Sequence, residues 1–375
     1  MSNSIALYIH IPWCVKKCPY CDFNSHTLKD TNIYSLYFDK LLEDFLLEIK
    51  KLKNKQITSI FIGGGTPSLA KPKHYAKLIN AIAKHADLAN NAEITMELNP
   101  GTCEFFVIQD YIAAGINRIS IGAQSFNSKH LQQLGRIHGP KEIYKVIDEL
   151  HSHAVVNFNI DIMHSLSQQS IKEAIADLTT AISLNPKHIS WYELTIEPNT
   201  LFAKTPPKLP SNNFTAKLNE IGSDILAKAG YNQYEISAYA KTSYQCLHNL
   251  NYWQYGDYIG IGAGAHSKIT QDDGKIIREI KYKHPSKYML QQNFIQESLV
   301  VATSELSFEY MLNNLRLLKP ITANDFERKT SLKFSSIYPQ LEQAASLGLV
   351  TYNTHSITPT SLGRNFLNNL IEIFI

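Results

Sequence analysis

Ile5-Ala6-Leu7-Tyr8-Ile9-His10-Ile11 is an apolar run typical of a buried strand, and Cys14, Cys18 and Cys21 follow it with the spacing C-x3-C-x2-C. Three thiolates on so short a segment can converge on one inorganic centre. A [4Fe–4S] cluster normally takes four thiolates, yet Phe23 stands two residues after Cys21, where a fourth cysteine would fit the spacing. A three-cysteine site leaves one iron free, and an open coordination position is typical of metal sites that do chemistry.

Zinc, a disulfide and a chance grouping fit the cysteine segment less well. Zinc would need a fourth ligand, which His26 could supply, but zinc sites commonly use two C-x2-C-like pairs and the sequence holds no second pair. A disulfide requires an oxidising compartment, of which the chain shows no sign. A chance grouping is disfavoured because the chain holds only five cysteines. We therefore expect an iron–sulfur cluster.

Length and composition predict a globular protein of about two domains, because 375 residues exceed the usual size of one. A net charge of +3 and a pI of about 8.4 are too mild to predict nucleic-acid binding. No apolar run reaches the length of a membrane span, and residues 1–4 lack the basic start of a signal peptide. Clustered cysteines in odd number fit a reducing compartment, so we expect a cytoplasmic protein.

Short apolar runs alternate with amphipathic segments along residues 1–240, which predicts parallel strands covered by helices. The predicted strands are Leu7–Ile11, Ser59–Ile62, Glu93–Leu98, Arg118–Ile121, Val155–Ile162 and Ile189–Leu194. The predicted helices are Ile33–Leu52, Tyr75–His85, Phe105–Ala114, Lys141–His151 and Ser170–Leu184. Six such units predict an α/β fold, a partial (β/α)6 barrel of the TIM type, whose chemistry would lie at the carboxyl ends of the strands.

The pattern changes after residue 240. Residues 241–289 are rich in Tyr, Gly, Asn and His and are predicted to connect two domains. Residues 290–375 have helical periodicity followed by a small β-ribbon, which predicts a C-terminal winged-helix-like domain. Because this domain has no concentrated basic stripe, we expect it to serve in docking and not in DNA binding.

Gly63-Gly64-Gly65-Thr66-Pro67 follows the second predicted strand directly. Alone, it would be taken as a tight turn, since both the Walker A pattern and the G-x-G-x-x-G spacing are absent. Glycines also let backbone groups approach a ligand closely. Beside the cysteine loop, the segment becomes a candidate cradle for a cofactor.

Polar side chains stand at or near the ends of the next strands. Glu97, Gln124 and Asp161 end or follow the third, fourth and fifth strands, and Arg136 could meet a carboxylate through two hydrogen bonds. Taken singly, each is an ordinary strand cap or surface pair. Their common position on one rim of the barrel favours a binding site.

These motifs together resemble the radical S-adenosylmethionine (SAM) superfamily, through Ile9-His10-Ile11-Pro12, the cysteine spacing with Tyr20 before Cys21, and Gly63–Pro67. Within it, the chain resembles the HemW-type haem chaperones, relatives of oxygen-independent coproporphyrinogen III dehydrogenase. The narrower resemblance is carried by His248-Asn249-Leu250-Asn251-Tyr252-Trp253 and by the glycine-rich Gly260–Ser267.

The resemblance implies that three cysteines hold three irons of a [4Fe–4S] cluster and that SAM chelates the fourth. It implies a role in SAM binding for the following residues: Tyr8 and Tyr20 flanking the cofactor, Gly64, Gly65 and Thr66 at its amino end, and Glu97, Gln124, Arg136 and Asp161 in further contacts. His248 matches the family's haem-linked histidine, since imidazole is a normal axial ligand of haem iron.

Without the resemblance, His248 would be interpreted as a hydrogen-bonded histidine in an aromatic, packed segment. Cys246 is a weaker candidate ligand, and Cys103 is expected to be a buried structural thiol.

Two features separate this chain from the patterns of its relatives. The dehydrogenase branch usually carries a further cysteine where Phe23 stands, and a longer segment before the cysteine loop, so both features favour the chaperone. Relatives commonly have G-L-P-x-Q-T after the fifth strand, where this chain has Ser165-Leu166-Ser167-Gln168-Gln169-Ser170. Loss of the Gly and Pro changes the backbone freedom of that loop.

We therefore expect a haem chaperone that binds a [4Fe–4S] cluster and SAM and delivers haem to acceptor haemoproteins, with respiratory enzymes as candidates. The alternative is an oxygen-independent coproporphyrinogen III dehydrogenase, which decarboxylates propionates by a radical route. The expected partners are haem, the acceptors and an electron donor to the cluster, without nucleic acid. A homodimer and a peripheral position at the inner face of the membrane are compatible with this function.

Overall fold

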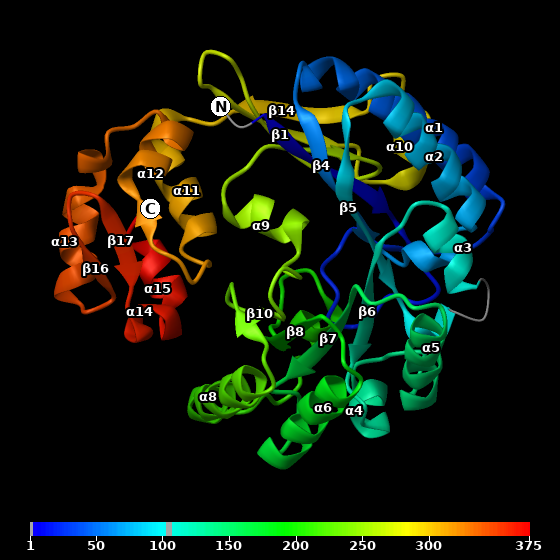
Figure 1. Ribbon diagram of the computed structural model, residues 1–375, viewed down its shortest axis with the longest axis horizontal. Helices are drawn as coiled ribbons and strands as arrows, with labels where there is room; N and C mark the ends of the chain where they lie inside the picture. Colours follow the sequence, from blue (N-terminus) through cyan, green and yellow to red (C-terminus); the bar gives the residue numbers. More distant parts are fainter. Residues whose placement is uncertain (1–2, 103–106) are drawn as a thin grey trace.

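The computed structural model describes residues 3–102 and 107–375. Its centre is a twelve-stranded sheet with the order β14-β13-β12-β11-β1-β4-β5-β6-β7-β8-β10-β9, which curves without closing (Figure 1). The prediction for Cys103 and the start of the predicted helix Phe105–Ala114 lie outside the described residues.

The six predicted strands lie side by side in the middle of this sheet, and they are parallel to one another. They are β1 (Ser4–Ile11), β4 (Gln56–Gly64), β5 (Leu88–Leu98), β6 (Arg118–Gln124), β7 (Phe158–His164) and β8 (His188–Glu193). The helices between them are α1 (Ile33–Leu52), α2 (Pro72–His85), α3 (Ile108–Ala113), α4 (Ser128–Gln133), α5 (Pro140–Ser152) and α6 (Ile171–Ser183), and α7 (Leu201–Lys204) and α8 (Asn212–Lys228) follow β8. The predicted α/β fold with a partial barrel is confirmed.

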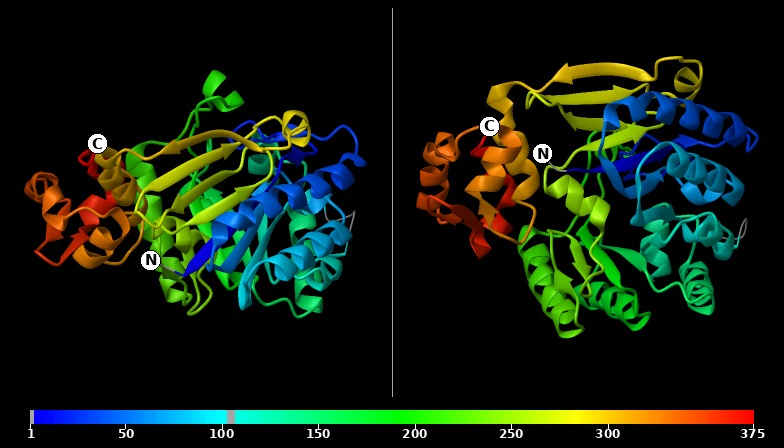
Figure 2. Two further views of the ribbon diagram at one scale, coloured as in Figure 1. Left: turned by 90° about the horizontal axis from the view of Figure 1, so that it is seen from above. Right: turned by 45° about the horizontal axis from the view of Figure 1, so that its top comes forward.

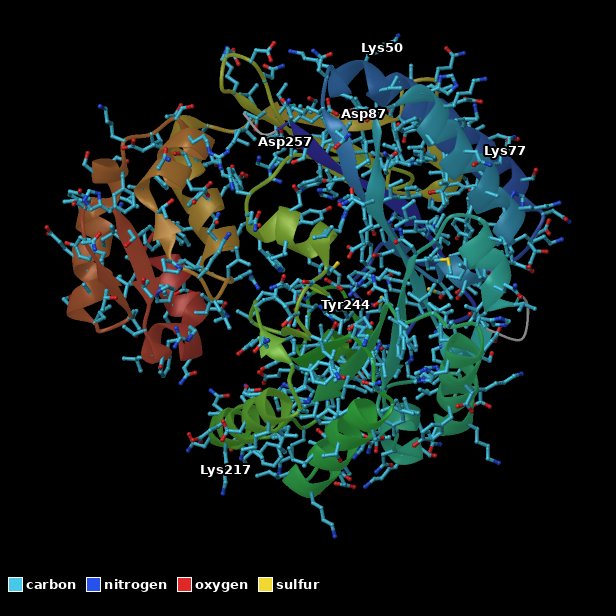
Figure 3. All side chains as sticks on the ribbon, viewed as in Figure 1. Lys50, Lys77, Asp87, Lys217, Tyr244 and Asp257 are labelled. Carbon is cyan, nitrogen blue, oxygen red and sulfur yellow. The ribbon has the colours of Figure 1, made fainter. Side chains whose placement is uncertain are left out.

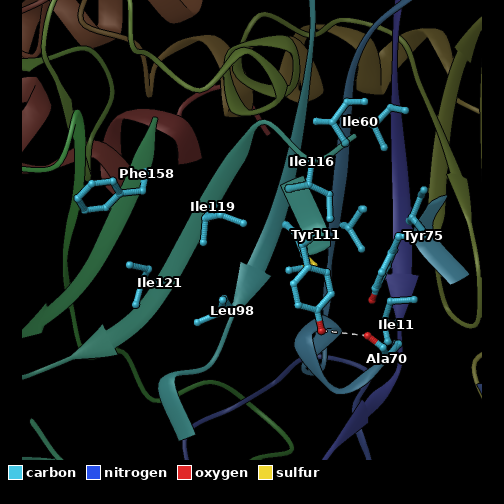
Figure 4. Close-up of a cluster of buried hydrophobic side chains, with 14 of the residues drawn as sticks. Ile11, Ile60, Ala70, Tyr75, Leu98, Tyr111, Ile116, Ile119, Ile121 and Phe158 are labelled. Atoms are coloured by element: carbon cyan, nitrogen blue, oxygen red, sulfur yellow. Dashed lines mark hydrogen bonds between the residues drawn. The ribbon is translucent and has the colours of Figure 1, made fainter. Parts of the chain in front are cut away.

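Alternation along the strands separates an apolar outer face from a more polar inner face. Ile60 in β4 and Met96 in β5 are fully buried against the covering helices. Figure 4 shows this outer core, where Tyr111 of α3 donates a hydrogen bond to the Ala70 carbonyl at 3.0 Å. The alternate residues, Phe61 and Thr95 among them, face the inside of the curved sheet. The polar groups that could bind a ligand therefore come from the same strands as the core.

The sheet extends beyond the six predicted strands at both edges. β11 (Tyr258–Ile261) pairs in parallel with β1, and β12 (His266–Thr270), β13 (Ile276–Lys281) and β14 (Ile295–Val300) follow antiparallel. At the other edge lie β10 (Ala238–Ala240) and β9 (Asn232–Gln233). Three strands of the large sheet, β11, β12 and β13, thus lie within the predicted connecting segment 241–289, and β14 lies past its end. The division of the chain at residues 240 and 290 stays a prediction.

The cysteine segment is tied to the end of β1 by a short parallel pair, β2 (Trp13–Cys14) and β3 (His26–Thr27). Cys18 and Cys21 lie in the loop between the two strands, as expected. Two more short helices complete the first part of the chain, α9 (Leu247–Trp253) and α10 (Pro285–Met289).

The C-terminal part has its own hydrophobic core, built around Tyr310, Phe326, Leu341 and Ile357. Its elements are α11 (Leu306–Asn314), β15 (Ile321–Thr322), α12 (Ala323–Thr330), α13 (Tyr338–Ser346), β16 (Val350–Tyr352), β17 (Ser356–Pro359), α14 (Ser361–Asn365) and α15 (Leu367–Glu372). The three strands form a small sheet of order β15-β17-β16, which is the predicted winged-helix-like arrangement. Figure 2 shows this unit beside the large sheet.

The outer surface carries many charged side chains. Lys77 on α2 and Lys217 on α8 point outward (Figure 3). Within residues 3–102 and 107–375, no helix combines the length and the apolarity that crossing a bilayer requires.

Candidate functional site

The carboxyl ends of the central strands surround a cavity of about 390 Å³. All but two of the residues predicted from the sequence line it: Cys14, Cys18, Tyr20, Cys21, Gly64, Gly65, Thr66, Glu97, Gln124, Arg136 and Asp161. The two exceptions are Tyr8 and His248, which lie deeper inside the sheet. The structure therefore brings together the cysteine loop, the glycine loop and the polar strand ends.

The three cysteines form one wall of the cavity as free thiols. The Leu28 amide donates to the Cys14 carbonyl at 2.9 Å, which joins the ends of the loop, and the Cys21 amide donates to the Cys18 carbonyl at 3.1 Å, which closes a turn within it. Burial raises the pKa of the Cys14 thiol, and the neighbouring cysteine thiolates raise it further. Burial also raises the pKa of the Cys21 thiol, and iron stabilises such thiols as thiolates. The donor set fits a cluster with three cysteine ligands.

The glycine loop lies against the cysteine segment. The Gly65 amide donates to the Ile11 carbonyl and the Thr66 amide to the Trp13 carbonyl, both at 2.7 Å. A Cβ on Gly65 would come within 2.5 Å of the Trp13 carbonyl oxygen. Gly64 has a φ of +110°, and a Cβ there would lie 2.4 Å from the His10 ring. Only glycine fits this close approach, which leaves the backbone open to the cavity.

Arg136 is partly buried at the cavity wall, and its Nε is shielded from solvent. It donates to the Gly122 carbonyl at 2.7 Å and lies 3.7 Å from the Cys18 sulfur. No carboxylate of the described residues forms an ion pair with it, and its Nε has no hydrogen-bond partner among them. A buried cation without an acidic partner is costly unless an anion joins it. The site is therefore suited to the carboxylate of a ligand.

The carboxylates of Glu97 in β5 and Asp161 in β7 face the cavity. Glu97 accepts a hydrogen bond from the Gly64 amide at 3.1 Å, and burial together with the nearby Asp161 raises the pKa of Glu97 to about 7. Asp161 accepts from Asn159 at 2.8 Å and from Ser120 at 3.3 Å, and burial raises its pKa. Two neighbouring, partly buried acids favour a positively charged or hydroxyl-bearing ligand.

One prediction about this pair needs correction. The sequence places Asp161 at the close of its strand, but β7 continues to His164, so Asp161 lies within the strand. The inner face of the sheet is still polar at Asp161, because the side chains of Asn159 and Ser120 donate hydrogen bonds to its carboxylate. A polar residue of the inner face can therefore lie within a strand, here because Asn159 of the same strand and Ser120 of β6 supply its hydrogen bonds.

Further cavity residues were missed by sequence reasoning. Tyr192 donates to the Gln124 side-chain oxygen at 2.7 Å, and Glu193, Thr195 and Glu197 line the cavity beside it. They lie at or after the end of the sixth strand, so applying the strand-end rule to this strand as well would have found them.

Tyr8 and His248 belong to an aromatic cluster, the barrel floor, formed by Tyr8, Phe61, His248 and Tyr252, in which His248 is buried and the other three rings are partly exposed. The His248 ring stacks on Phe61 at 5.1 Å and meets the Tyr252 ring at 5.1 Å. The Tyr8 hydroxyl lies 3.0 Å from His10 Nδ1, so a neighbouring side chain already engages it. Figure 1 shows α9, which carries His248, between the large sheet and the C-terminal domain.

His248 is only 2% exposed. Its Nδ1 lies 3.3 Å from the Ser59 hydroxyl, whereas its Nε2 has no hydrogen-bond partner among the described residues. Burial lowers the pKa of His248 to about 3, so the ring is neutral at pH 7. A neutral imidazole with a free nitrogen is chemically suited to iron, but a porphyrin would reach it only if α9 moved.

The Ser165–Ser170 loop adapts to the loss of glycine. Ser165 adopts a φ of +56°, which glycine tolerates best, and its hydroxyl lies 2.9 Å from the Thr215 hydroxyl. Leu166 is buried with Leu134, Met163 and Leu194 beside the cavity. The loop therefore keeps a packed position in spite of its altered sequence.

Comparison with known proteins assigns the chain to a family. The radical SAM superfamily profile matches residues 8–178, and the HemN C-terminal domain profile matches residues 303–366. The HemW haem chaperone of Escherichia coli K12 is 47% identical over 371 residues, which cover 99% of this chain and 98% of that protein. The HemW haem chaperone of Haemophilus influenzae is 46% identical over 375 residues, which cover 99% and 98%.

A solved structure is similar over the whole fold. The radical SAM coproporphyrinogen III oxidase HemN of Escherichia coli superimposes with a TM-score of 0.84 at 21% identity, covering 100% of this chain and 90% of that one. At this identity the likeness concerns the fold alone. The sequence relatives are decisive: this chain belongs to the radical SAM superfamily and, within it, to the HemW family.

Proposed function

We propose that the protein is a haem chaperone that binds a [4Fe–4S] cluster and SAM and hands haem to acceptor haemoproteins. The observation that carries this proposal is a cavity in which three free thiols face a glycine cradle and a partly buried arginine, in a chain of the HemW family. Neither the three thiols alone nor the cradle and arginine alone would be sufficient. A three-thiol wall without the cradle would suit a simple metal site.

Cys14, Cys18 and Cys21 would hold three irons of the cluster, and SAM would occupy the remaining iron. When bound, these groups supply the reductive chemistry of the superfamily, whereas the protein provides geometry and electrostatics. Arg136 would orient the SAM carboxylate through charge-assisted hydrogen bonds. Tyr20 would flank the cofactor beside Arg136.

The remaining cavity residues would orient the rest of SAM. Gly64, Gly65 and Thr66 offer backbone groups to its amino end. Glu97 and Asp161 would meet positive or hydroxyl groups, and Gln124, held by Tyr192, would make a further contact. The assignments of Tyr8 to SAM and of His248 to haem belong to the same proposal, although both lie on the barrel floor and not at the cavity.

Two observations favour the chaperone over the dehydrogenase. Phe23 lines the cavity mouth where the dehydrogenase branch carries a cysteine. Glu193 and Glu197 also line it, and their carboxylates would repel the four propionates of coproporphyrinogen III.

The proposal includes the partners and the location of the protein. An electron donor must reach the cluster, and haem acceptors, with respiratory enzymes as candidates, must reach the haem. A reducing cytoplasm would keep the three cluster cysteines from forming disulfides. Homodimer formation and peripheral contact with the inner membrane face are compatible with such handover.

Anaerobic reconstitution followed by two assays tests the proposal. The protein should bind haem and pass it to an apo-haemoprotein, and it should leave coproporphyrinogen III unchanged under reducing conditions with SAM. Formation of protoporphyrinogen IX, or failure to bind and transfer haem, would contradict the proposal.

A further inference from the structure

Two histidines far apart in the sequence meet at the surface beside the cysteine loop. His26 lies in β3 and His284 immediately before α10, and their ring centroids are 5.2 Å apart with the ring planes at 67°. Asn24 fixes this contact, because its side-chain amide donates to the Ala263 and Lys283 carbonyls at 2.9 and 2.8 Å. The pair is therefore held by the fold.

The surroundings of the pair combine apolar and cationic groups. Phe23 is 55% exposed and Val15 is 44% exposed, so both present apolar surface to a ligand. Lys17 donates to the Phe23 carbonyl at 2.9 Å, and Lys283 is exposed next to His284. Asp22 is the acidic residue of this segment. We call the set of Lys17, Phe23, His26, Lys283 and His284 the histidine face.

Each component matches a part of haem. A neutral imidazole is an axial ligand of haem iron, an exposed phenyl ring packs against a porphyrin, and ammonium groups attract its propionates. The histidine face is accessible as it stands: His284 is exposed and His26 is partly exposed. The barrel floor is different, because His248 is closed off by Phe61 and Tyr252.

We propose that the histidine face is the site at which the protein first takes up haem. His26 or His284 ligates the iron, Phe23 lies against the porphyrin, and Lys17 and Lys283 meet the propionates. This inference rests on the proposed haem-carrying function and adds its entry site. His248 is then at most a later ligand, reached after α9 moves.

Haem titration of the full-length protein, followed by its Soret absorption, tests the proposal. The His26→Gln/His284→Gln double variant keeps a hydrogen-bonding side chain at each position but lacks an imidazole. It should weaken haem binding by about tenfold or more and alter the Soret band. The matched control is His355→Ala, which removes an exposed histidine from the C-terminal domain and should change nothing.

A second variant tests the charges independently of the histidines. Lys17→Glu/Lys283→Glu should weaken the binding of haem but not of haem dimethyl ester, which lacks the anionic carboxylates. Unchanged haem affinity in the histidine double variant, or an equal loss of affinity for haem and for its dimethyl ester in the lysine double variant, would overturn the entry site while leaving the chaperone function standing. Absence of haem binding by the wild-type protein would overturn both.

Discussion

The cavity and the barrel floor both lie on the inner side of the curved sheet but differ in what they leave unsatisfied. The cavity is open and polar, and its partly buried Arg136 has no acidic partner in the described chain. In the aromatic floor, the neutral His248 is closed off from solvent, and one of its ring nitrogens has no hydrogen-bond partner in the described chain. An open site with an unbalanced charge is ready for a ligand, whereas a closed site must first be opened.

The largest loss of stability should come from a substitution in the glycine loop, which forms one side of the cavity. Gly65→Ala would force a Cβ against the Trp13 backbone, which cannot yield as a side chain could. We expect the free energy of unfolding to fall by about 3 kcal/mol, measured by denaturant unfolding. Gly230→Ala is the control, since open space surrounds Gly230 and only its φ of +81° is unfavourable. It should cost about 1 kcal/mol, and equal losses would show that the cavity wall is not tightly built.

The unbalanced charge of the cavity is probed by Arg136→Gln. Loss of a charge-assisted contact worth about 1.5–3 kcal/mol should weaken SAM binding by roughly 10- to 100-fold, measured by calorimetry on the reconstituted protein. Arg328→Gln removes an exposed arginine of the C-terminal domain and serves as control. Undiminished SAM affinity in Arg136→Gln would mean that the guanidinium is structural.

A series of unfolding measurements at different pH values tests the raised pKa of Glu97 in the cavity. Glu97 keeps its proton in the folded protein up to about pH 7, but loses it near its ordinary pKa of 4.5 in the unfolded chain. Stability should therefore fall as the pH rises between these values. Glu97→Gln removes this loss and should stabilise the ligand-free protein by on the order of 2 kcal/mol at pH 8, with no gain at pH 4. A pH-independent effect would contradict the raised pKa.

Of these substitutions, the one in the barrel floor should change the stability least at neutral pH. His248→Phe replaces a neutral buried ring with an apolar one that can stack on Phe61, so unfolding at pH 7 should change by less than about 1 kcal/mol. The pKa of His248 is lowered from 6.5 to about 3, so the wild type loses stability as the pH falls through this range. The His248→Phe variant should lose less stability over the same pH range. A large destabilisation at pH 7 would show that the hydrogen bond to Ser59 is essential.

The sequence predicted the six central strands because their outer faces are apolar and their helices have a clear period. It missed the strands at the edge, and β13 shows why. Lys281 in β13 is buried, held by Asp44 and Glu48 of α1 at 2.6 Å each. A strand that buries an ion pair looks polar in the sequence, and only the tertiary partner explains its burial.

The same limit applies to the candidate site. Strand ends identified the cavity because parallel strands bring their carboxyl ends together, whatever the details of each loop. The motif containing His248 identified a family feature, but its burial depends on where α9 packs, which no local pattern encodes. The contact between His26 and His284 joins segments about 260 residues apart and could be found only in three dimensions.

The central claim is that Cys14, Cys18 and Cys21 hold a cluster with one iron left open. Electron paramagnetic resonance of the anaerobically reconstituted, reduced protein tests it most directly, with and without SAM. The account predicts a cluster signal that shifts on SAM addition, that is abolished in Cys14→Ala/Cys18→Ala/Cys21→Ala, and that persists in the control Cys246→Ala. A signal indifferent to SAM, or one that survives the triple substitution, would contradict it.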